Sequence, residues 1–268
     1  MTVFSANGDR LIHRQVIGSG ATFPVSVAVR GNLVYVLNAR DGGSVQGFLR
    51  VGDTLIRMPA WHRSLGLNPA LTPEFTHTPG QVAFTPDGSE LIVTTKSNGN
   101  DIDVFAVRPD GGISARPVVN PDAGNQPFSV TFDAGGHLVV AEGAPNTVAT
   151  FTLHGNGTVT VDSRVATGQQ ATCWITPDGT TFFAGNAGSG SVFGFSDNGS
   201  GTLRALGNTG TDAGTVDAAT SADGTSLYVQ TGGNGIVDEY HVNSGGSPAK
   251  IGSVTVPGAV GGQGIATS

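Results

Sequence analysis

The chain has few charged residues, a single cysteine and no long apolar run, and each shortage excludes a class of protein. Only 12% of its 268 residues are charged, and 13 basic residues against 20 acidic ones give a net charge of −7. A protein with this balance has no basic surface for nucleic acid or anionic lipid, so we expect neither as a partner. No apolar run approaches the length that crosses a membrane. One cysteine cannot form an intrachain disulfide, so the redox compartment stays open.

Helical periodicity is also missing, because apolar residues alternate along the chain instead of recurring every three or four positions. The 42 glycines suit many short strands joined by tight turns. No secretory signal precedes the first expected strand. We therefore expect a cytoplasmic location for the chain as written, and a secreted one if an upstream signal has been lost.

A repeat of strand, polar turn and strand organises the chain. Aspartate–glycine or glycine-rich turns precede most copies, with Pro86, Ala134, Pro177 and Ala222 at the same turn position and spacings of 48, 43 and 45 residues. Such turns are strong hairpin signals, and a period of about 45 residues is typical of propeller blades. The strand–turn–strand copies occupy residues 32–50, 89–107, 136–153, 180–196 and 225–242.

These repeats predict an all-β fold, a β-propeller of four-stranded blades in a single domain over residues 1–268. Five complete blades begin near Thr22, Thr78, Gln126, Gln169 and Gly214. A closing blade would combine residues 2–20 with residues 261–268 and would lack its second strand, as if upstream repeats had been removed. The alternative is a natural six-bladed ring with a three-stranded closing blade. An unpaired edge there makes self-association possible.

The turns "FTPDGSE" and "ITPDGTT", the strand end "LYVQTGGNG", and "TFPVSVAV" followed by "LVYVLNA" resemble the lactonase-type seven-bladed propellers. This family includes relatives of 6-phosphogluconolactonase and of the carboxymuconate-lactonizing enzyme. The resemblance covers essentially the whole chain and implies seven blades, an N-terminally truncated ring and a bacterial hydrolase of carbohydrate metabolism. The family often carries His-Pro-His at the start of a first strand. The segment "HTPGQVAFTPDG" matches it through His77 and Pro79, which implies a catalytic role for His77.

In a propeller, the ends of second strands and the starts of first strands surround one mouth of the central channel, where a binding site would be built. Polar residues recur at both positions. The aligned strand ends are Asn38, Lys96, Glu142, Asn186 and Thr231, and the aligned strand starts are Ser26, Gln81, Ser129, Thr172 and Asp217. Lys96 and Glu142 fall on adjacent blades, where they form either a structural ion pair or a catalytic cation and base.

An insertion between Met58 and Gly80 makes the first interval between strand ends longer than the later ones, 58 residues against 46, 44 and 45. We expect it to overhang the same mouth, and it holds Trp61, Arg63 and His77. Long loops of this kind are often functional. The competing interpretation is a surface loop that covers an apolar patch through Trp61.

The first functional hypothesis is a lactone hydrolase that uses no metal or other cofactor and takes a small neutral or carboxylated lactone. Glu142 would be the general base. Lys96, with Arg40 or Arg63, would face the oxyanion, and Asn38, Gln81 and Asn186 would hold ring hydroxyls. Trp61 and Asp217 complete the expected substrate-binding set.

Two alternatives stay open. One is a calcium-dependent lactonase-type propeller, in which the hard oxygen donors Glu142, Asn186, Asn38 and Asp217 hold the ion. The other is a propeller that binds a ligand or a protein without catalysis, because the strand ends are rich in asparagine, glutamine and threonine. The sequence leaves the substrate, the metal dependence and the oligomeric state undetermined.

Overall fold

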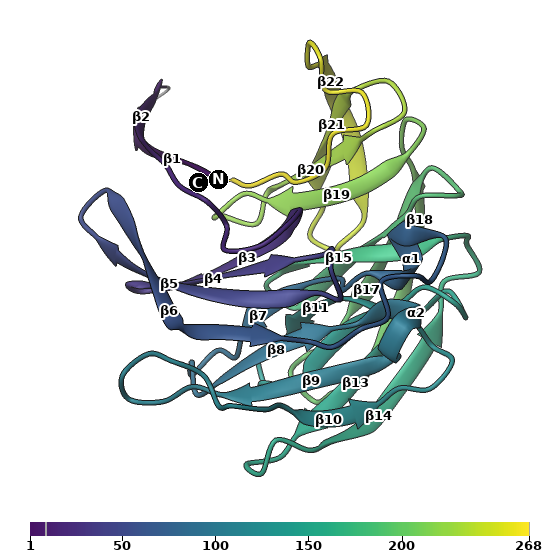
Figure 1. Cartoon of the computed structure of the whole chain (residues 1–268). Coiled ribbons are helices and arrows are strands. Elements are labelled where there is room, and N and C mark those ends of the chain that lie inside the picture. The colour runs from purple at the N-terminus through teal and green to yellow at the C-terminus, as the bar shows by residue number, and fades with distance from the viewer. Residues whose placement is uncertain (9, 268) are drawn as a thin grey trace. The chain divides into compact units, whose positions relative to one another are not determined.

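The structure is a computed structural model that describes residues 1–8 and 10–267, and its regular elements are almost all strands (Figure 1). Two four-residue helical turns are the only helices among these residues. No helix in the described part of the chain has the length and apolarity to cross a membrane. The chain divides into two compact units, residues 1–126 with 156–158, and residues 127–155 with 159–268.

The first unit contains a two-stranded hairpin and two four-stranded antiparallel meanders. The hairpin consists of β1 (Thr2–Asn7) and β2 (Arg10–Val16). The first meander is β3 (Pro24–Arg30), β4 (Leu33–Asn38), β5 (Ser44–Val51) and β6 (Thr54–Ser64). The second is β7 (Val82–Phe84), β8 (Glu90–Thr94), β9 (Asp101–Ala106) and β10 (Val118–Pro121), with α1 (Glu74–His77) before β7 and α2 (Lys96–Gly99) after β8.

The second unit contains three four-stranded antiparallel meanders. They are β11 (Pro127–Phe132), β12 (Leu138–Glu142), β13 (Thr147–Leu153) and β14 (Val159–Ala166); β15 (Thr172–Asp178), β16 (Thr181–Asn186), β17 (Ser191–Ser196) and β18 (Arg204–Gly210); and β19 (Thr215–Thr220), β20 (Ser226–Thr231), β21 (Ile236–Val242) and β22 (Pro248–Thr255). Within this unit β15 packs against both β11 and β19.

The expected all-β class is confirmed, and the expected closing blade is wrong. Residues 262–267 form no strand, so the sheet near the N-terminus is the β1–β2 hairpin alone among the described residues. The C-terminal segment instead follows β19, where Ile265 N–H donates to Asp217 Oδ2 at 3.2 Å and the Thr267 hydroxyl donates to Thr220 O. The seven-blade ring, the truncation and the single domain stay predictions.

Burial differs between the second and fourth strands of a meander, and the sequence explains why. All five residues of β12 are buried, whereas no residue of the outer strand β14 is buried. A strand that is apolar on both faces must be covered on both faces. A strand that alternates apolar and polar residues can form the rim. In β20 every second residue is buried, whereas β22 contains no buried residue.

The aspartate–glycine turns adopt one hydrogen-bonding pattern in two sheets. Asp87 accepts hydrogen bonds from Thr85 Oγ1 and from the Ser89 N–H and hydroxyl. Asp223 makes the equivalent contacts between β19 and β20. These donors lower the pKa of both aspartates to about 2. The local sequence therefore sets these turns, since the aspartate caps its own loop.

Trp61 lies in the core of the first unit, on β6. It is 4% exposed and its ring stacks on Tyr35 with ring centres 6.2 Å apart. Gly47 and Gly111 leave the room for this ring, because a Cβ at either position would lie within 2.9 Å of Trp61 atoms. The Tyr35 hydroxyl donates to Gly111 O at 2.8 Å and fixes the same corner.

We expect Trp61→Ala to lower the free energy of unfolding by roughly 3–5 kcal/mol, because it empties a filled site in the core. Thermal unfolding followed by circular dichroism measures this loss. Phe75→Ala is the matched control, since Phe75 is 70% exposed, and we expect it to change stability by less than about 0.5 kcal/mol. Equal, small effects of both changes would contradict the core position of Trp61.

Candidate functional site

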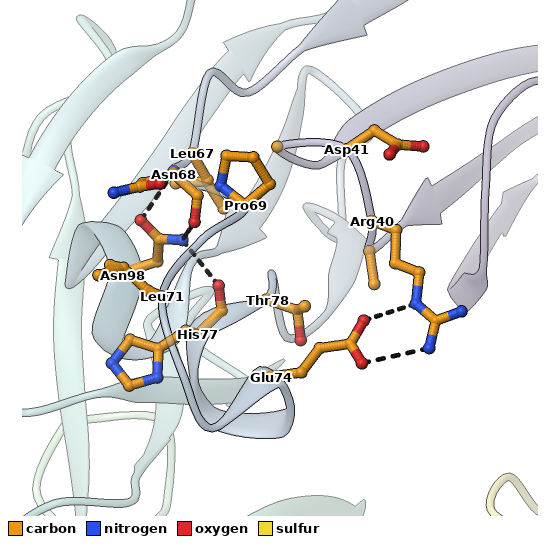
Figure 2. A pocket seen from close by; sticks show the side chains of 12 residues that line it. Arg40, Asp41, Leu67, Asn68, Pro69, Leu71, Glu74, His77, Thr78 and Asn98 are labelled. Atoms are coloured by element: carbon orange, nitrogen blue, oxygen red, sulfur yellow. Dashed lines mark hydrogen bonds and ion pairs between the residues drawn. The ribbon is translucent and has the colours of Figure 1, made fainter.

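One pocket of the first unit lies where β4 ends and the segment between β6 and β7 folds over it. It is formed by the turn from β4 to β5, by loop 65–80 with α1, and by α2. The empty space between its residues is about 310 Å³, a figure that includes open solvent. The residues that line it are Ala39, Arg40, Asp41, Gly42, Leu67, Asn68, Pro69, Leu71, Glu74, His77, Thr78 and Asn98 (Figure 2).

Arg40 closes one side of the pocket by pairing with Glu74 of α1. Its Nε lies 2.5 Å from Glu74 Oε1 and its Nη2 lies 3.2 Å from Oε2 (Figure 2). This hydrogen bonding raises the pKa of Arg40 and lowers the pKa of Glu74. The side chains are 47% and 54% exposed, so water competes for the pair and it contributes little to stability.

Lys96, at the start of α2, holds loop 65–80 through hydrogen bonds. It is 6% exposed, and its Nζ donates to Phe75 O at 2.5 Å and to Thr78 Oγ1 at 3.0 Å. Its backbone is left-handed, with a φ of 51°, because β8 has already ended at Thr94 and the chain turns into α2. The expected alignment of Lys96 with the last residues of second strands is therefore wrong. The contacts to Phe75 and Thr78 give it a positioning role for loop 65–80.

His77 ends α1 at the rim of the pocket. Its Nδ1 lies 3.0 Å from Pro73 O and 3.0 Å from Thr76 Oγ1, and its carbonyl accepts a hydrogen bond from Asn98 Nδ2 at 2.8 Å. In Figure 2 the imidazole points away from the Arg40–Glu74 pair. A proton on Nδ1 donates to Pro73 O and leaves Nε2 as the nitrogen that can accept a proton.

Trp61 and Arg63, which we expected in an overhanging loop, lie on β6 outside the pocket. β6 runs from Thr54 to Ser64, so the loop begins at residue 65 and not at Met58. Arg63 donates from Nη2 to Ile113 O at 2.7 Å and from Nε to Ser114 O at 2.8 Å. These contacts tie β6 to the loop before β10. The sequence missed them because the fourth strand is longer here than the repeat predicts.

Asn38 and Gln81 lie next to the pocket-forming segments. Asn38 is fully buried, and its Nδ2 donates to Ser19 O at 3.2 Å. Its Oδ1 and the hydroxyl of Ser44, its cross-strand neighbour, are buried without a hydrogen-bond partner in the described part of the chain. Buried polar atoms usually have a partner, so a water or a ligand hydroxyl suits this position. Gln81 starts the chain into β7, and its N–H donates to Thr94 Oγ1 at 3.0 Å.

Glu142 ends β12 in the second unit and is held by two neighbouring strands. Arg164 of β14 donates from Nε to Oε2 at 2.7 Å and from Nη2 to Oε1 at 2.6 Å. The hydroxyl of Thr147 on β13 also donates to Oε2. The carboxylate has no exposed surface. Because both oxygens accept strong hydrogen bonds, Glu142 is poorly suited to take a proton from water.

Two other expected residues also lie in the second unit. Asn186 ends β16, and its Oδ1 accepts a hydrogen bond from Thr172 Oγ1 at 2.7 Å. Asp217 lies on β19 and accepts hydrogen bonds from the N–H groups of Ala218 at 2.8 Å and Ile265 at 3.2 Å. Burial raises the pKa of Asp217, although these two N–H donors oppose the rise.

Asp103 is a buried carboxyl group that the sequence analysis did not single out. It lies on β9, is 6% exposed, and faces Val93 across the ladder. Burial, with a smaller contribution from the charge of Asp101, raises its pKa to about 7. Asp238 is its counterpart on β21, and that carboxylate has Lys250 Nζ at 2.7 Å. An aspartate inside the otherwise apolar run "IDVFA" is the signal that could have identified Asp103.

The calcium alternative requires a cluster of metal ligands, and the described part of the chain contains no preformed one. No group of three or more histidine, cysteine, aspartate or glutamate side chains is placed to hold a metal ion there. In the expected set, Glu142 uses both oxygens for Arg164 and Thr147. Asn186 uses its oxygen for Thr172.

No protein-family model matches the chain, and no curated protein matches it in sequence. Solved structures do match it in fold. A proposed 6-phosphogluconolactonase from Bacteroides uniformis has a TM-score of 0.81 at 18% identity, over 95% of this chain and 77% of that one. A periplasmic gluconolactonase from Pseudomonas aeruginosa has a TM-score of 0.77 at 19% identity, over 95% and 76%.

A virginiamycin B lyase from Staphylococcus aureus is also similar, with a TM-score of 0.60 at 16% identity over 89% of this chain and 72% of that one. At these identities the likeness shows the fold alone. The chain is thus similar in fold to these solved structures, and its all-β class agrees with the resemblance. Proteins of this fold carry out more than one reaction, so the chemistry must come from the site.

We expect Glu142→Gln to destabilise the second unit by about 1–3 kcal/mol, because a neutral amide replaces the buried carboxylate that accepts hydrogen bonds from Arg164 and Thr147. Chemical denaturation of Glu142→Gln, Arg164→Met and the double variant measures the coupling between the two side chains. We expect the double variant to lose less stability than the sum of the losses in the two single variants. Strictly additive losses would contradict the pairing.

Asp103 predicts a dependence of stability on pH. Its pKa is about 7 in the folded protein and about 3.9 in an unfolded chain. The folded state therefore holds a proton that the unfolded state releases. Its contribution to stability is present at low pH and is lost as the pH rises from about 4 to about 7, by an amount on the order of 4 kcal/mol.

Asp103→Asn removes this titration. Compared with the unchanged protein, the variant should have a higher melting temperature at about pH 8 and no advantage at about pH 4. Asp110→Asn is the control, because the Asp110 side chain is 62% exposed. A variant whose melting temperature follows the same pH curve as the unchanged protein would rule out this role for Asp103.

Proposed function

We propose that the protein is a hydrolase that opens small lactones, and that the pocket of the first unit binds the lactone. The observation that carries the proposal is that Arg40, His77 and Asn98 all line this pocket. The likeness in fold to a gluconolactonase over 95% of the chain supports the class of reaction. The residue roles below rest on the contacts within the first unit.

Arg40 is the proposed recognition residue for the substrate. Its present partner Glu74 is a half-exposed carboxylate held by two hydrogen bonds. A carboxylate on the substrate presents the same two oxygens and can replace Glu74 in the same bidentate geometry. The pocket lining contains one arginine and no lysine, which favours a neutral or carboxylated lactone over a phosphorylated one.

His77 is the proposed general base, through Nε2. It takes a proton from water, the oxygen of that water bonds to the lactone carbonyl carbon, and the ring C–O bond then breaks. The proton returns to the ring oxygen as it leaves, so the products are a hydroxy acid and the unchanged imidazole. With a neutral lactone, which offers Arg40 no carboxylate, the Arg40 guanidinium faces the oxyanion that forms on the carbonyl oxygen. Lys96 acts only by holding Phe75 and Thr78, and Glu142 acts only in the structure of the second unit.

Asn38 is fully buried beside the pocket and does not line it, so it is the proposed partner of a buried water that in turn accepts from a ligand hydroxyl. Its buried Oδ1 makes no hydrogen bond within the described residues, and Ser44 next to it is in the same state. A sugar-derived lactone carries hydroxyl groups that donate to such an acceptor. Gln81, Asn186 and Asp217 stay binding residues that only the sequence predicts: none of them lines this pocket, and each is already hydrogen-bonded within its own unit.

The test is proton release from a panel of γ- and δ-lactones, measured with and without a chelator. We expect turnover that the chelator leaves unchanged. His77→Gln should reduce it by about 100-fold or more, whereas Glu142→Gln should retain it. His62→Gln is the matched control, because His62 lies on β6 outside the pocket, and it should retain full turnover.

Three outcomes would overturn the assignment. Turnover that survives His77→Gln but not Glu142→Gln would move the base to the second unit. Turnover that the chelator abolishes and calcium restores would favour the calcium-dependent alternative. A folded protein that lactones stabilise against heat without any proton release would be a binding protein and not a hydrolase.

A further inference from the structure

The backbone of Phe23 is left-handed, a conformation that a large side chain rarely adopts. Phe23 is the residue before β3 and has a φ of 63°. In this conformation the Cβ of an L-residue crowds the following carbonyl oxygen, whereas glycine adopts it freely. A bulky residue here is an outlier. Strained residues of this kind gather at binding and catalytic sites, where the surrounding structure holds them in place.

The second unit builds the same backbone twice and fills it with small residues. Phe23 O accepts a hydrogen bond from the N–H of Ala39, which follows β4, at 2.8 Å. The residues before β15 and β19 accept the same bond from the residues after β16 and β20: Ala171 O from Ala187 N at 3.0 Å, and Gly214 O from Gly232 N at 2.7 Å. Ala171 and Gly214 are also left-handed, with φ of 55° and 81°. This backbone thus requires a left-handed residue, but it does not require an aromatic ring.

Arg40 occupies the partner position of the same repeated pairing. Its N–H donates to Thr22 O at 3.3 Å. Glycines make the equivalent bonds in the second unit: Gly188 N donates to Gln170 O, and Gly233 N donates to Ala213 O. The Phe23 ring and the Arg40 guanidinium therefore meet at a place where the other two copies have small residues. The Arg40 Cζ lies 4.5 Å from the centre of the Phe23 ring, within the distance of about 6 Å at which a cation and a ring attract each other.

Phe23 and Glu74 hold different parts of the guanidinium. Glu74 binds the edge that carries Nε and Nη2 (Figure 2), whereas the Phe23 ring lies against the central carbon. Loss of the exposed Glu74 contact, which water weakens, frees the edge and leaves the ring contact in place. A side chain that is already ordered loses less entropy when it binds its next partner. The ring thus keeps Arg40 ready for an incoming anion.

We propose that Phe23 is a positioning residue of the pocket, which holds Arg40 while the guanidinium exchanges Glu74 for an oxygen of the ligand. The inference rests on the proposed function, because it takes the ligand of Arg40 to be a lactone or its hydroxy-acid product. A neutral lactone brings no carboxylate to the pocket, and its hydrolysis creates one. Arg40 therefore meets first the oxyanion and then the product carboxylate, and Phe23 acts on both through Arg40. The ordered guanidinium is the gain that offsets the strained backbone of Phe23.

The mobility of the Arg40 side chain tests this role without any lactone. NMR relaxation of the arginine Nε–H groups measures it, with the Arg40 signal assigned from Arg40→Lys. We expect Arg40 to stay ordered in Glu74→Gln, because the ring still holds it. It should become mobile in Glu74→Gln combined with Phe23→Ala, and Phe23→Tyr in place of Phe23→Ala should restore the order. Arg108 is the internal control, since its pair with Asp110 is similarly exposed and its signal should stay the same in all Phe23 variants.

Turnover of a neutral γ-lactone then connects the ring to the reaction. Glu74→Gln with Phe23→Ala should lose about two- to fivefold in kcat/KM relative to Glu74→Gln alone, the size of an exposed cation–ring contact. The melting temperature should not fall, because Ala171 shows that the same backbone accepts alanine. Phe23→Gly should melt at the same or a higher temperature, since it relieves the strain.

Three results would overturn the role of Phe23. They are an Arg40 that is mobile in Glu74→Gln alone, an Arg40 that stays ordered after Phe23→Ala is added, and a Phe23→Gly variant that melts lower while Arg40 stays ordered. The last result would make the ring a packing residue. Failure of the proposed function gives a different result. The unchanged protein would then open no lactone, whereas Arg40 would still lose its order in the double variant.

Discussion

The structure depends on how each sheet accommodates the polar residue that ends its buried second strand. Asn38, Glu142, Asn186 and Thr231 occupy this place, and all are fully buried. A buried polar atom without a partner costs free energy, so each must be matched by a neighbouring strand. Glu142 is matched by a charged arginine, whereas the Asn38 oxygen is not matched within the described residues. The residue at this position thus stabilises the sheet of Glu142, whereas in the sheet of Asn38 it leaves a buried acceptor without a partner among the described residues.

The pocket of the first unit owes its form to two unequal attachments of one loop. The Lys96 ammonium holds the loop from a buried position through Phe75 O and Thr78 Oγ1. The Arg40–Glu74 pair holds it at the surface, where water weakens ion pairs. The exposed ion pair can open to admit a ligand, while the buried contacts of Lys96 keep the loop in position. This asymmetry is the physical basis for assigning recognition to Arg40 and positioning to Lys96.

The β1–β2 hairpin differs from the four-stranded sheets in how its edges are protected. Each four-stranded meander of the described chain ends in an outer strand that carries a charge or a proline, and these residues discourage further pairing. The hairpin has its β2 side fastened to β6 and its β1 side bare.

The sequence by itself determined most strands, the aspartate–glycine turns and the presence of an insertion before β7, because these features depend on neighbouring residues. Alternation and aspartate–glycine turns act over a few positions, and the recurring strand ends pointed to Asn38, whereas His77 came from the resemblance to lactonase-type propellers. The tertiary structure decided which charges meet. Arg164 reaches Glu142 from 22 residues away, and β6 carries Trp61 and Arg63 away from the pocket because it extends to Ser64. Such partnerships depend on strand register and packing, which no local pattern of residues records.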